Sequence, residues 1–458
     1  MPQQTTSVQD YQNLTFCVPK RGSGLYSDAT SNLSRPVVVS SQVEGMGVGG
    51  IIPPNHVLLK VDRFGFSANN VTYGLLGEDP HFRYFEFHNA PNTNTTSSKT
   101  HGVIPVWGYA TVVQSTHPRI SVGERVFGYL GMSRYLLLPV DHDVNKYNFY
   151  VPRPHLPEGT YHVPVIRCPL KCFEDRRPYN QITRCAADPL YDPMREDELM
   201  IYRPLFWTSF WCEDWLHTTK VAKDTDGIII SSASAKTAYC LAFVLNLRRL
   251  YGKVALPAGA DWTGTGGTAQ PRIVGVTSKR NLEFTKSLRL YDEVFTYDQI
   301  NELAKRGSRW VYVDVAGNKE FNNKVFKSFG SHIAKGVSLG MSHPSSSKEN
   351  ESFANSNSRL EMFFMPEWLA VRRTNTSVKE ITQLQFAGWD ALMRTCHQWI
   401  QIERVWWSGA AIWQDNVKEV IEAYEECVNG EIGPDRGLIL SMWEKGQFDK
   451  TSQVKAKL

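Results

Sequence analysis

Three apolar segments in the middle of the chain share one pattern, because each is followed by a turn and then by residues with helical spacing. The segments are GIIIS at 227–231, IVGV at 273–276 and WVYVD at 310–314. Apolar runs of this length that alternate with helical patterns are typical of βαβ units and of a parallel sheet. The pattern therefore predicts an α/β, doubly wound, Rossmann-like domain over residues 216–345.

A second pattern, short strands separated by Gly and Pro, precedes this domain. HVLLKVDRFGFS, from His56, has the alternating apolar positions of a half-buried strand, and VIPVWGYATVV, RISVGERVFGYL and SRYLLLPV follow it. Such a series predicts a small antiparallel β-barrel over residues 46–215. Within it, residues 141–205 have little periodicity and many Pro, Tyr, Arg and Asp residues. We expect a long insertion there, ending in an aromatic helix.

The two ends of the chain have patterns of their own. Residues 1–45 are polar and lack a sustained period, which predicts a loosely packed N-terminal arm. Residues 346–458 begin with a polar, low-complexity stretch and continue with amphipathic, Trp-rich segments. They predict a mobile loop followed by a helical C-terminal segment.

Composition indicates a globular protein with more than one domain. The chain has 458 residues, 42% hydrophobic and 21% charged, and a formal net charge of +4. Its cations are scattered among acidic residues, which favours neither nucleic acid nor an anionic membrane as a partner. The start is polar and no apolar run is long enough to span a bilayer, so we expect a cytoplasmic protein. Eight dispersed cysteines make a disulfide framework an unfavourable interpretation.

The turn after the first parallel strand is the candidate phosphate loop. In a dinucleotide-binding fold this strand turns tightly into a helix, whose amide groups hold the pyrophosphate. Small residues fill the glycine positions here, and hydroxyls and one lysine add donors. The candidate cofactor-binding residues of the loop are Ser232, Ser234, Ala235, Lys236 and Thr237. The alternative is a Ser/Ala turn that only caps a buried helix.

The turn after the second strand bears on the identity of the cofactor. Thr277, Ser278, Lys279 and Arg280 stand where an NAD-specific site usually has an acidic residue for the ribose hydroxyl. Hydroxyls and two cations suit a 2′-phosphate, so the turn favours NADP(H) over NAD(H). The alternative is a solvated basic turn. Further cofactor candidates follow the later strands, at the edge where ligands bind in such sheets: Asp314, Asn318, Gly340 and His343.

Together these segments resemble the medium-chain dehydrogenase/reductase superfamily. The marks of the resemblance are VLLKVDRFGFSANNVTYG, PVWGYATVVQSTHPRISVGERVFGY, SSASAKTA, GVTSKRNLEFTKSLRLYDEVFTYD and VYVDVAGN, over roughly residues 50–345. The chain looks closest to a branch described as a domain of unknown function in fungi and bacteria. The resemblance implies a GroES-like catalytic barrel, a Rossmann-like cofactor domain with the active site in the cleft between them, and a C-terminal segment packed on the catalytic domain.

The resemblance also bears on metal binding. Zinc-dependent members supply Cys, His and acidic ligands, whereas this chain has Ser67-Ala68-Asn69-Asn70 where the first catalytic ligand is expected. Cys168 and Cys172 have a Cys-x3-Cys spacing, but no fourth nearby cysteine completes a structural zinc site. We therefore expect no metal, and the zinc-independent quinone and enoyl reductases are the nearer analogue.

A zinc-independent reductase needs a group that polarises the substrate carbonyl and a proton source. Asn69 and Asn70 match the segment where related reductases carry an Asn near the nicotinamide, and Tyr73 is a candidate for polarising or protonating the substrate. Packing under the barrel is the alternative role for Tyr73. Tyr179 and Thr208 are further catalytic candidates.

We therefore expect an NADP(H)-dependent, metal-independent reductase of a carbonyl-bearing or conjugated small organic substrate. A non-redox lyase, hydrolase or isomerase on the same scaffold is one alternative, and a nucleotide-sensing binding protein is another, because fold does not decide activity. The expected partner is a small organic molecule, with neither nucleic acid nor membrane, and the question of a homodimer stays open.

Overall fold

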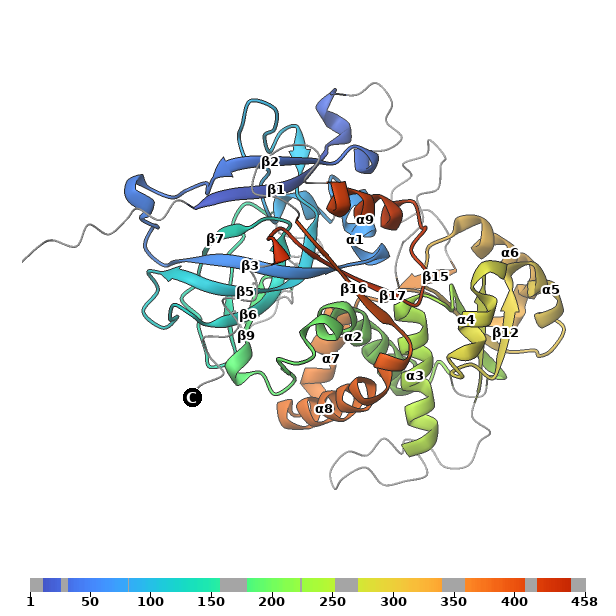
Figure 1. Cartoon of the computed structure of the whole chain (residues 1–458). Coiled ribbons are helices and arrows are strands. Elements are labelled where there is room, and N and C mark those ends of the chain that lie inside the picture. The colour runs from blue at the N-terminus through green and yellow to red at the C-terminus, as the bar shows by residue number, and fades with distance from the viewer. Residues whose placement is uncertain are drawn as a thin grey trace, which may run out of the picture. The chain divides into compact units, whose positions relative to one another are not determined.

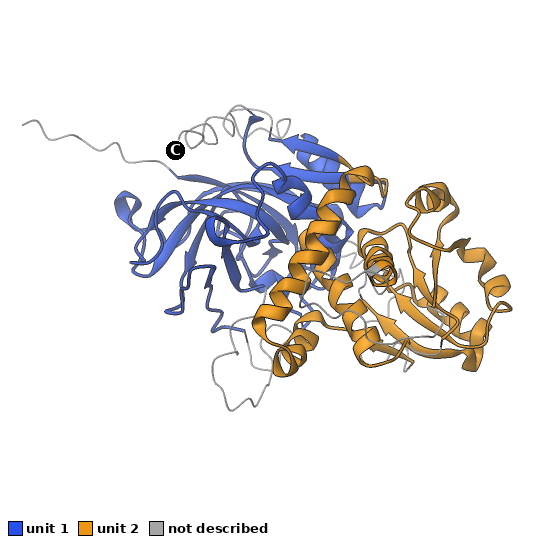
Figure 2. Ribbon diagram, turned by 90° about the horizontal axis from the view of Figure 1, so that it is seen from below, with its two compact units in different colours: residues 1–201, 402–432, 437–458 blue, residues 202–401, 433–436 orange. Residues whose placement is uncertain are grey.

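The computed structural model describes residues 11–25, 32–80, 82–156, 179–222, 225–251, 271–339, 359–407 and 418–445. The chain divides into two compact units, coloured separately in Figure 2. Unit 1 contains residues 1–201, 402–432 and 437–458, and unit 2 contains residues 202–401 and 433–436. No helix in the described ranges is both long enough and apolar enough to cross a membrane.

Unit 1 is built around a curved, mostly antiparallel sheet of eight strands (Figure 1). Seven follow one another in the order β16-β17-β3-β5-β6-β9-β8, and β7 pairs with β3. The strands are β3 (His56–Phe66), β5 (Pro105–Ser115), β6 (Arg125–Gly131), β7 (Tyr135–Pro139), β8 (Asn148–Tyr150), β9 (Gln181–Arg184), β16 (Gln401–Trp406) and β17 (Arg436–Ser441). The short strands expected before residue 141 are therefore present. Strand β3 is buried at all but two positions, instead of alternating, because neighbouring elements cover both of its faces.

The expected N-terminal arm is wrong for residues 12–19 and 37–42, which are strands of a second sheet in unit 1. Its order is β2-β1-β4, with β1 (Gln12–Pro19), β2 (Val37–Gln42) and β4 (His101–Gly102). Strand β1 is buried along almost its whole length, including its Thr and Asn positions. Polar residues interrupt the hydrophobic pattern of this strand, so the pattern did not predict it. Pairing with distant segments on both sides stabilises it.

The segment expected as an insertion is in part regular. Strands β8 and β9 pair with each other and add an edge to the large sheet, and residues 157–178 between them lie outside the described ranges. The aromatic segment is helical as expected: α2 runs from Glu196 to Thr218. A short helix, α1 (Ala68–Leu75), follows β3 directly.

Unit 2 contains a parallel sheet of six strands in the order β12-β11-β10-β13-β14-β15. These are β10 (Gly227–Ser231), β11 (Arg272–Thr277), β12 (Glu293–Thr296), β13 (Trp310–Asp314), β14 (Ile333–Ser338) and β15 (Leu360–Met362). Numbered along the chain, the order is 3-2-1-4-5-6, that of the dinucleotide-binding doubly wound fold. The expected fold class is confirmed, and the point where the strand order reverses lies between β10 and β13.

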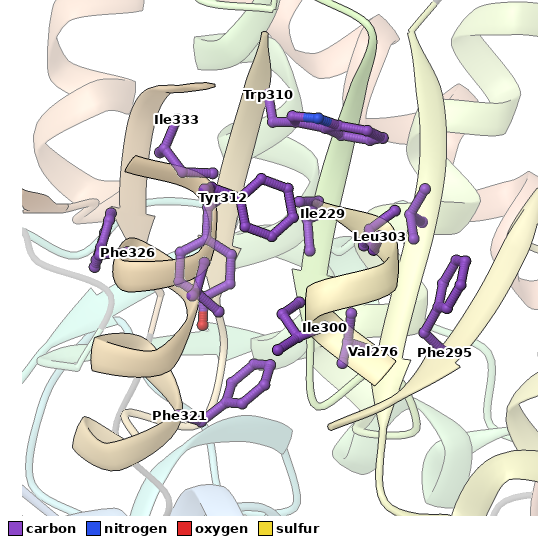
Figure 3. Packing of buried hydrophobic residues seen from close by; sticks show 13 residues of the cluster. Ile229, Val276, Phe295, Ile300, Leu303, Trp310, Tyr312, Phe321, Phe326 and Ile333 are labelled. Carbon is purple, nitrogen blue, oxygen red and sulfur yellow. The ribbon is translucent and has the colours of Figure 1, made fainter. Parts of the chain in front are cut away.

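Helices connect the parallel strands of unit 2 and cover the sheet. They are α3 (Lys236–Tyr251), α4 (Leu282–Ser287), α5 (Ile300–Leu303) and α6 (Lys319–Phe329). Figure 3 shows side chains of α5 and α6 meeting those of β10 and β13 in one apolar layer, with Trp310 and Tyr312 among them. Helix α6 owes its place to an amphipathic sequence whose Phe321, Val325, Phe326 and Phe329 are buried.

The C-terminal part of the chain contributes to both units. Helices α7 (Met365–Asn375) and α8 (Val378–Thr395) belong to unit 2, where Trp389 stacks on Trp207 with ring centroids 5.5 Å apart. Strands β16 and β17 extend the large sheet of unit 1, and α9 (Lys418–Val428) belongs to the same unit. The expected helices are present, but the segment also contains three strands, β15, β16 and β17, which the pattern did not predict.

Candidate nucleotide-binding and reductase site

The loop after β10 keeps the backbone conformation of a glycine turn although it has no glycine. Ser232 directly follows the strand with φ at +49°, in the left-handed region that glycine favours. The Ala235 amide donates to the Ser232 carbonyl (2.7 Å), and α3 begins at Lys236. The first amide groups of a helix have no partner within the helix, and helix starts of this kind are common anion-binding sites.

The close approach of this loop to the sheet depends on a glycine in the neighbouring strand. A Cβ atom at Gly275 of β11 would lie 2.9 Å from the Cβ of Ala233 and 2.9 Å from the ring of Tyr291. The Tyr291 hydroxyl donates to the Ala233 carbonyl (2.8 Å), and the Ala233 amide donates to the Val276 carbonyl (3.0 Å). Gly275 thus provides the space that a glycine in the loop would otherwise provide.

The hydroxyls of the loop are engaged with the protein itself. Ser234 lies 3.3 Å from the Thr277 hydroxyl and accepts from the Asn281 amide (3.0 Å). Ser232 Oγ lies 3.0 Å from the Tyr297 hydroxyl. These contacts bind the loop to the ends of β11 and β12, so the hydroxyls of Ser232 and Ser234 already have partners within unit 2.

Lys236 has a role that the sequence did not predict. Its ammonium group donates to the backbone carbonyls of Arg436 (2.8 Å) and Pro434 (3.2 Å). Residues 433–436 belong to unit 2 although the chain on either side of them belongs to unit 1. Lys236 therefore holds residues 433–436 next to the start of α3 by two hydrogen bonds. The Thr237 carbonyl accepts from Ser209 (2.8 Å), and Ala238 is fully buried.

The basic turn lies at the carboxyl end of β11, next to the loop. Thr277 is buried and reaches Ser234, and Ser278 directly precedes a 3-10 turn that contains Lys279 and Arg280. Lys279 is exposed and pairs with Asp298 at 2.9 Å, and this hydrogen bond raises the pKa of the lysine. A cation thus lies where the sequence places the 2′-phosphate, with an acidic neighbour from the turn after β12.

Asp314 joins the two strands at the reversal of strand order. Its carboxylate accepts from the Ser231 hydroxyl at the end of β10 (3.1 Å) and from the side-chain amide of Asn322 (2.7 Å). The Gly317 amide donates to it as well (3.1 Å). Burial raises the pKa of this carboxyl. Asn318 caps α6 by accepting from the Phe321 amide, and Gly340 and His343 lie outside the described residues.

The catalytic candidates of the barrel separate into two roles. Asn70 is buried, and its side chain accepts from the Ser67 amide (2.9 Å) and donates to the Pro105 carbonyl (3.2 Å). These bonds make Asn70 the reciprocal capping residue of α1. Asn69 instead donates from its side-chain amide to the Tyr73 hydroxyl (2.8 Å).

Tyr73 lies at the centre of an aromatic cluster in unit 1. The indole of Trp107 is a second donor to its hydroxyl (3.4 Å), and the hydroxyls of Tyr129 and Tyr179 also interact with it. The ring of Tyr73 lies 5.3 Å from that of Tyr129 and 6.5 Å from that of Tyr179. The structure therefore brings together Asn69, Tyr73 and Tyr179, which the sequence selected from two distant segments.

Burial raises the pKa of Tyr73, so its phenol carries a proton at neutral pH. With two nitrogen donors directed at its oxygen, that proton is free to be donated to the neighbouring phenols or to a ligand. Thr208 lies on the part of α2 that belongs to unit 2, and its hydroxyl donates to the Pro204 carbonyl within the helix (3.2 Å). The structure does not place Thr208 in the cluster.

Trp107, Tyr129 and Tyr297 are site residues that sequence reasoning missed. They come from strands or turns whose aromatic positions are equally suited to a core, so the sequence holds no signal that separates them. Within the described ranges, no cluster of three or more His, Cys, Asp or Glu side chains is arranged to hold a metal ion. Cys168 and Cys172 lie outside those ranges.

Comparison with solved structures bears on the class of fold. The chain is similar to a putative NADPH:quinone reductase from Mesorhizobium loti, with a TM-score of 0.51 and 11% identity, over 94% of this chain and 98% of that chain. CurA from Vibrio vulnificus in complex with NADPH gives a TM-score of 0.48 and 10% identity, covering 94% and 99%. The likeness to the quinone reductase shows a shared fold, and a Rossmann-like sheet is what the sequence resemblance implied.

A family model, Protein of unknown function (DUF2855), matches residues 64–422. The chain belongs to this family. No curated protein matches the chain.

Proposed function

We propose that the protein is an NADP(H)-dependent reductase of a carbonyl-bearing or conjugated small organic molecule. The observation that carries the proposal is the left-handed Ser232 turn at the end of β10, within a sheet of the order 3-2-1-4-5-6. A strained serine in the place of glycine is kept only where the surrounding structure requires that backbone path. This turn connects β10 directly to the start of α3, where the first amide groups of the helix lie.

The residues of unit 2 fit a nucleotide that is held mainly by backbone. The amides of residues 236–238 suit the pyrophosphate, and the cations of Lys279 and Arg280 suit a 2′-phosphate. Lys236 is left out of the phosphate site, because two carbonyls hold its ammonium group. When bound, NADPH supplies the hydride for the reduction.

In unit 1, Asn69, Tyr73 and Tyr179 are the proposed reductase residues. Asn69 and Trp107 fix the Tyr73 oxygen, and Tyr73 or Tyr179 donates a hydrogen bond and a proton to the substrate oxygen. The similar structure of a putative NADPH:quinone reductase from Mesorhizobium loti supports this chemistry. That likeness by itself shows only a shared layout of the chain.

Thermal unfolding with NADPH and with NADH tests nucleotide binding. A ligand that binds only the folded protein at about 100 times its Kd stabilises it by roughly 2.7 kcal/mol, so we expect NADPH to raise the Tm by several degrees and NADH to raise it less. Lys279→Ala and Arg280→Ala should abolish the difference between the two nucleotides. Lys305→Ala is the matched control, because this exposed lysine lies between α5 and the start of β13, away from the carboxyl ends of the strands.

Two outcomes would refute the proposal at different points. If neither nucleotide raises the Tm, the site in unit 2 does not bind a dinucleotide. If NADPH binds but its absorbance does not fall with any member of a panel of quinones, enones and aldehydes, the protein is a nucleotide-binding protein and not a reductase of this class. Tyr73→Phe should lower kcat and leave the NADPH-induced rise in Tm unchanged.

A further inference from the structure

Arg153 of unit 1 is a half-buried cation that has no negatively charged neighbour among the described residues. It follows β8, and its guanidinium donates to the Phe87 carbonyl and lies 5.1 Å from the centroid of the Phe87 ring. Its Nε is inaccessible to solvent and has no hydrogen-bond partner. Among the described residues, no carboxylate forms an ion pair with Arg153.

Two other arginines of the same unit have carboxylate partners. Arg63 pairs with Glu196 at 2.9 Å and with Asp197 at 2.7 Å, and Arg125 pairs with Asp62 and with Glu196. Removing a guanidinium from water without a counterion is costly, so an uncompensated one has to be explained. Burial lowers the pKa of Arg153 to about 10, and the group therefore stays charged at neutral pH.

The ionisable neighbours of Arg153 do not neutralise it. Burial, and then the charge of Arg153, lower the pKa of His88 to about 3, so this histidine is uncharged at neutral pH. His88 Nε2 lies 3.1 Å from the Tyr129 carbonyl. The hydroxyl of Tyr129, which raises the pKa of Arg153, is the other ionisable group beside it. Among the described residues, none therefore neutralises the charge of Arg153.

A series of neighbouring aromatic rings connects Arg153 with the proposed reductase residues. The Phe87 ring lies 5.2 Å from that of Tyr129, which lies 4.9 Å from that of Tyr179. Tyr179 is half-buried and contacts Tyr73. A ligand that combines a negative charge with a planar unsaturated body matches both features, since ring faces favour flat groups and a guanidinium favours a carboxylate.

We propose that Arg153 binds the carboxylate of a planar, conjugated organic acid whose unsaturated body lies against the half-buried ring of Tyr179. As a statement about the substrate it rests on the proposed reductase function, because it gives the conjugated substrate an acidic group. Binding of the acid, by contrast, depends only on residues of unit 1 and not on the reductase activity. Arg153 would then be the residue that determines specificity for an acidic substrate.

The test compares two probes that differ in charge and share a shape. trans-Cinnamate carries the carboxylate, and cinnamamide is its neutral counterpart. Binding to the full-length protein is followed by thermal unfolding and by quenching of tryptophan fluorescence, with and without saturating NADPH. We expect cinnamate to bind at least about tenfold more tightly than cinnamamide, the difference expected for a charge-assisted hydrogen bond.

Arg153→Gln should remove the preference for cinnamate, and Arg153→Lys should retain part of it. Arg119→Gln is the matched control: it removes one positive charge from unit 1, at an exposed arginine that also donates to a backbone carbonyl, that of His142. This control should keep the preference unchanged. Near-UV circular dichroism shows whether each variant is folded, and the two probes on the wild-type protein give a result even where a variant fails to fold.

Several outcomes would overturn the inference. Equal affinity for cinnamate and cinnamamide, a preference that survives Arg153→Gln, or no binding of cinnamate, sorbate or benzoate under either condition would each do so. These results are independent of the response to NADPH alone. Loss of the nucleotide response with an intact preference for cinnamate refutes the reductase and leaves the acid-binding site standing.

Discussion

Ser232 provides a direct test of whether the loop after β10 has a glycine-type backbone. In most positions alanine is more stable than glycine, because glycine loses more conformational entropy on folding. At Ser232 the order should reverse, because its φ of +49° is costly for any residue with a Cβ atom. The prediction is that Ser232→Gly is more stable than Ser232→Ala.

The magnitude follows from three terms. The left-handed backbone destabilises the folded state by about 1–2 kcal/mol when the residue is not glycine. Glycine removes this cost, but its larger loss of conformational entropy on folding takes back roughly 0.5–1 kcal/mol. Both substitutions lose the bond between Ser232 and Tyr297, with O···O at 3.0 Å, which is worth about 1 kcal/mol. Relative to wild type we therefore expect Ser232→Ala to lose about 1 kcal/mol and Ser232→Gly to lose about half as much or less.

Equilibrium urea unfolding of the full chain, followed by tryptophan fluorescence, measures the difference between the two variants. The matched control is Ser328 in α6, which is also half-buried and whose hydroxyl also makes hydrogen bonds, to Asn301 and to the Lys324 carbonyl. There the backbone is helical, and Ser328→Ala should be more stable than Ser328→Gly by about 1 kcal/mol. If Ser232→Ala is as stable as Ser232→Gly while the control behaves as expected, the left-handed turn is not present and the main support for a nucleotide loop is lost.

Three further predictions concern the surroundings of this loop. Burial raises the pKa of Asp314, so the folded protein binds this proton more tightly than the unfolded chain does. The stability of the wild type relative to Asp314→Asn should therefore fall as the pH rises from about 4 through the raised pKa, and then level off. A difference in urea unfolding that does not change with pH would contradict this. Lys236→Met should destabilise the protein by about 2–3 kcal/mol through loss of two bonds to carbonyls, yet change the Kd for NADPH less than about threefold, as isothermal titration would show. Gly275→Ala should cost about 1–3 kcal/mol in urea unfolding, and adding Ala233→Gly should recover part of that loss, whereas strictly additive costs would argue against the close contact.

The fold class could be predicted from the sequence because the parallel strands carry their own signal. Strands buried on both faces are continuous apolar runs, and Gly227–Ser231 and Trp310–Asp314 are of this kind. Strand β1 could not be predicted in the same way, since Asn13 and Thr15 interrupt its apolar positions and its stability comes from pairing with β2 and β4. Long-range pairing of this kind leaves no local period.

The candidate site shows the same division between local and long-range information. Asn69, Tyr73 and the basic turn at Lys279 could be selected because they stand at recognisable places beside a strand or helix start. The role of Lys236 could not, because it depends on carbonyls about 200 residues away in the sequence. For the same reason Asn70 looked equivalent to Asn69, although only one of these two side-chain amides is committed to capping α1.

A glycine fingerprint describes a sequence, whereas phosphate binding depends on where backbone amides lie. In this protein the turn is kept by a left-handed serine, and the space beside it is provided by Gly275 on the next strand. Two requirements that a fingerprint places in one loop are thus divided between two strands that are adjacent in the sheet. Searches that demand glycine within the loop would miss such a site, whereas a search for a positive φ after the first strand, facing a glycine on the second, would find it.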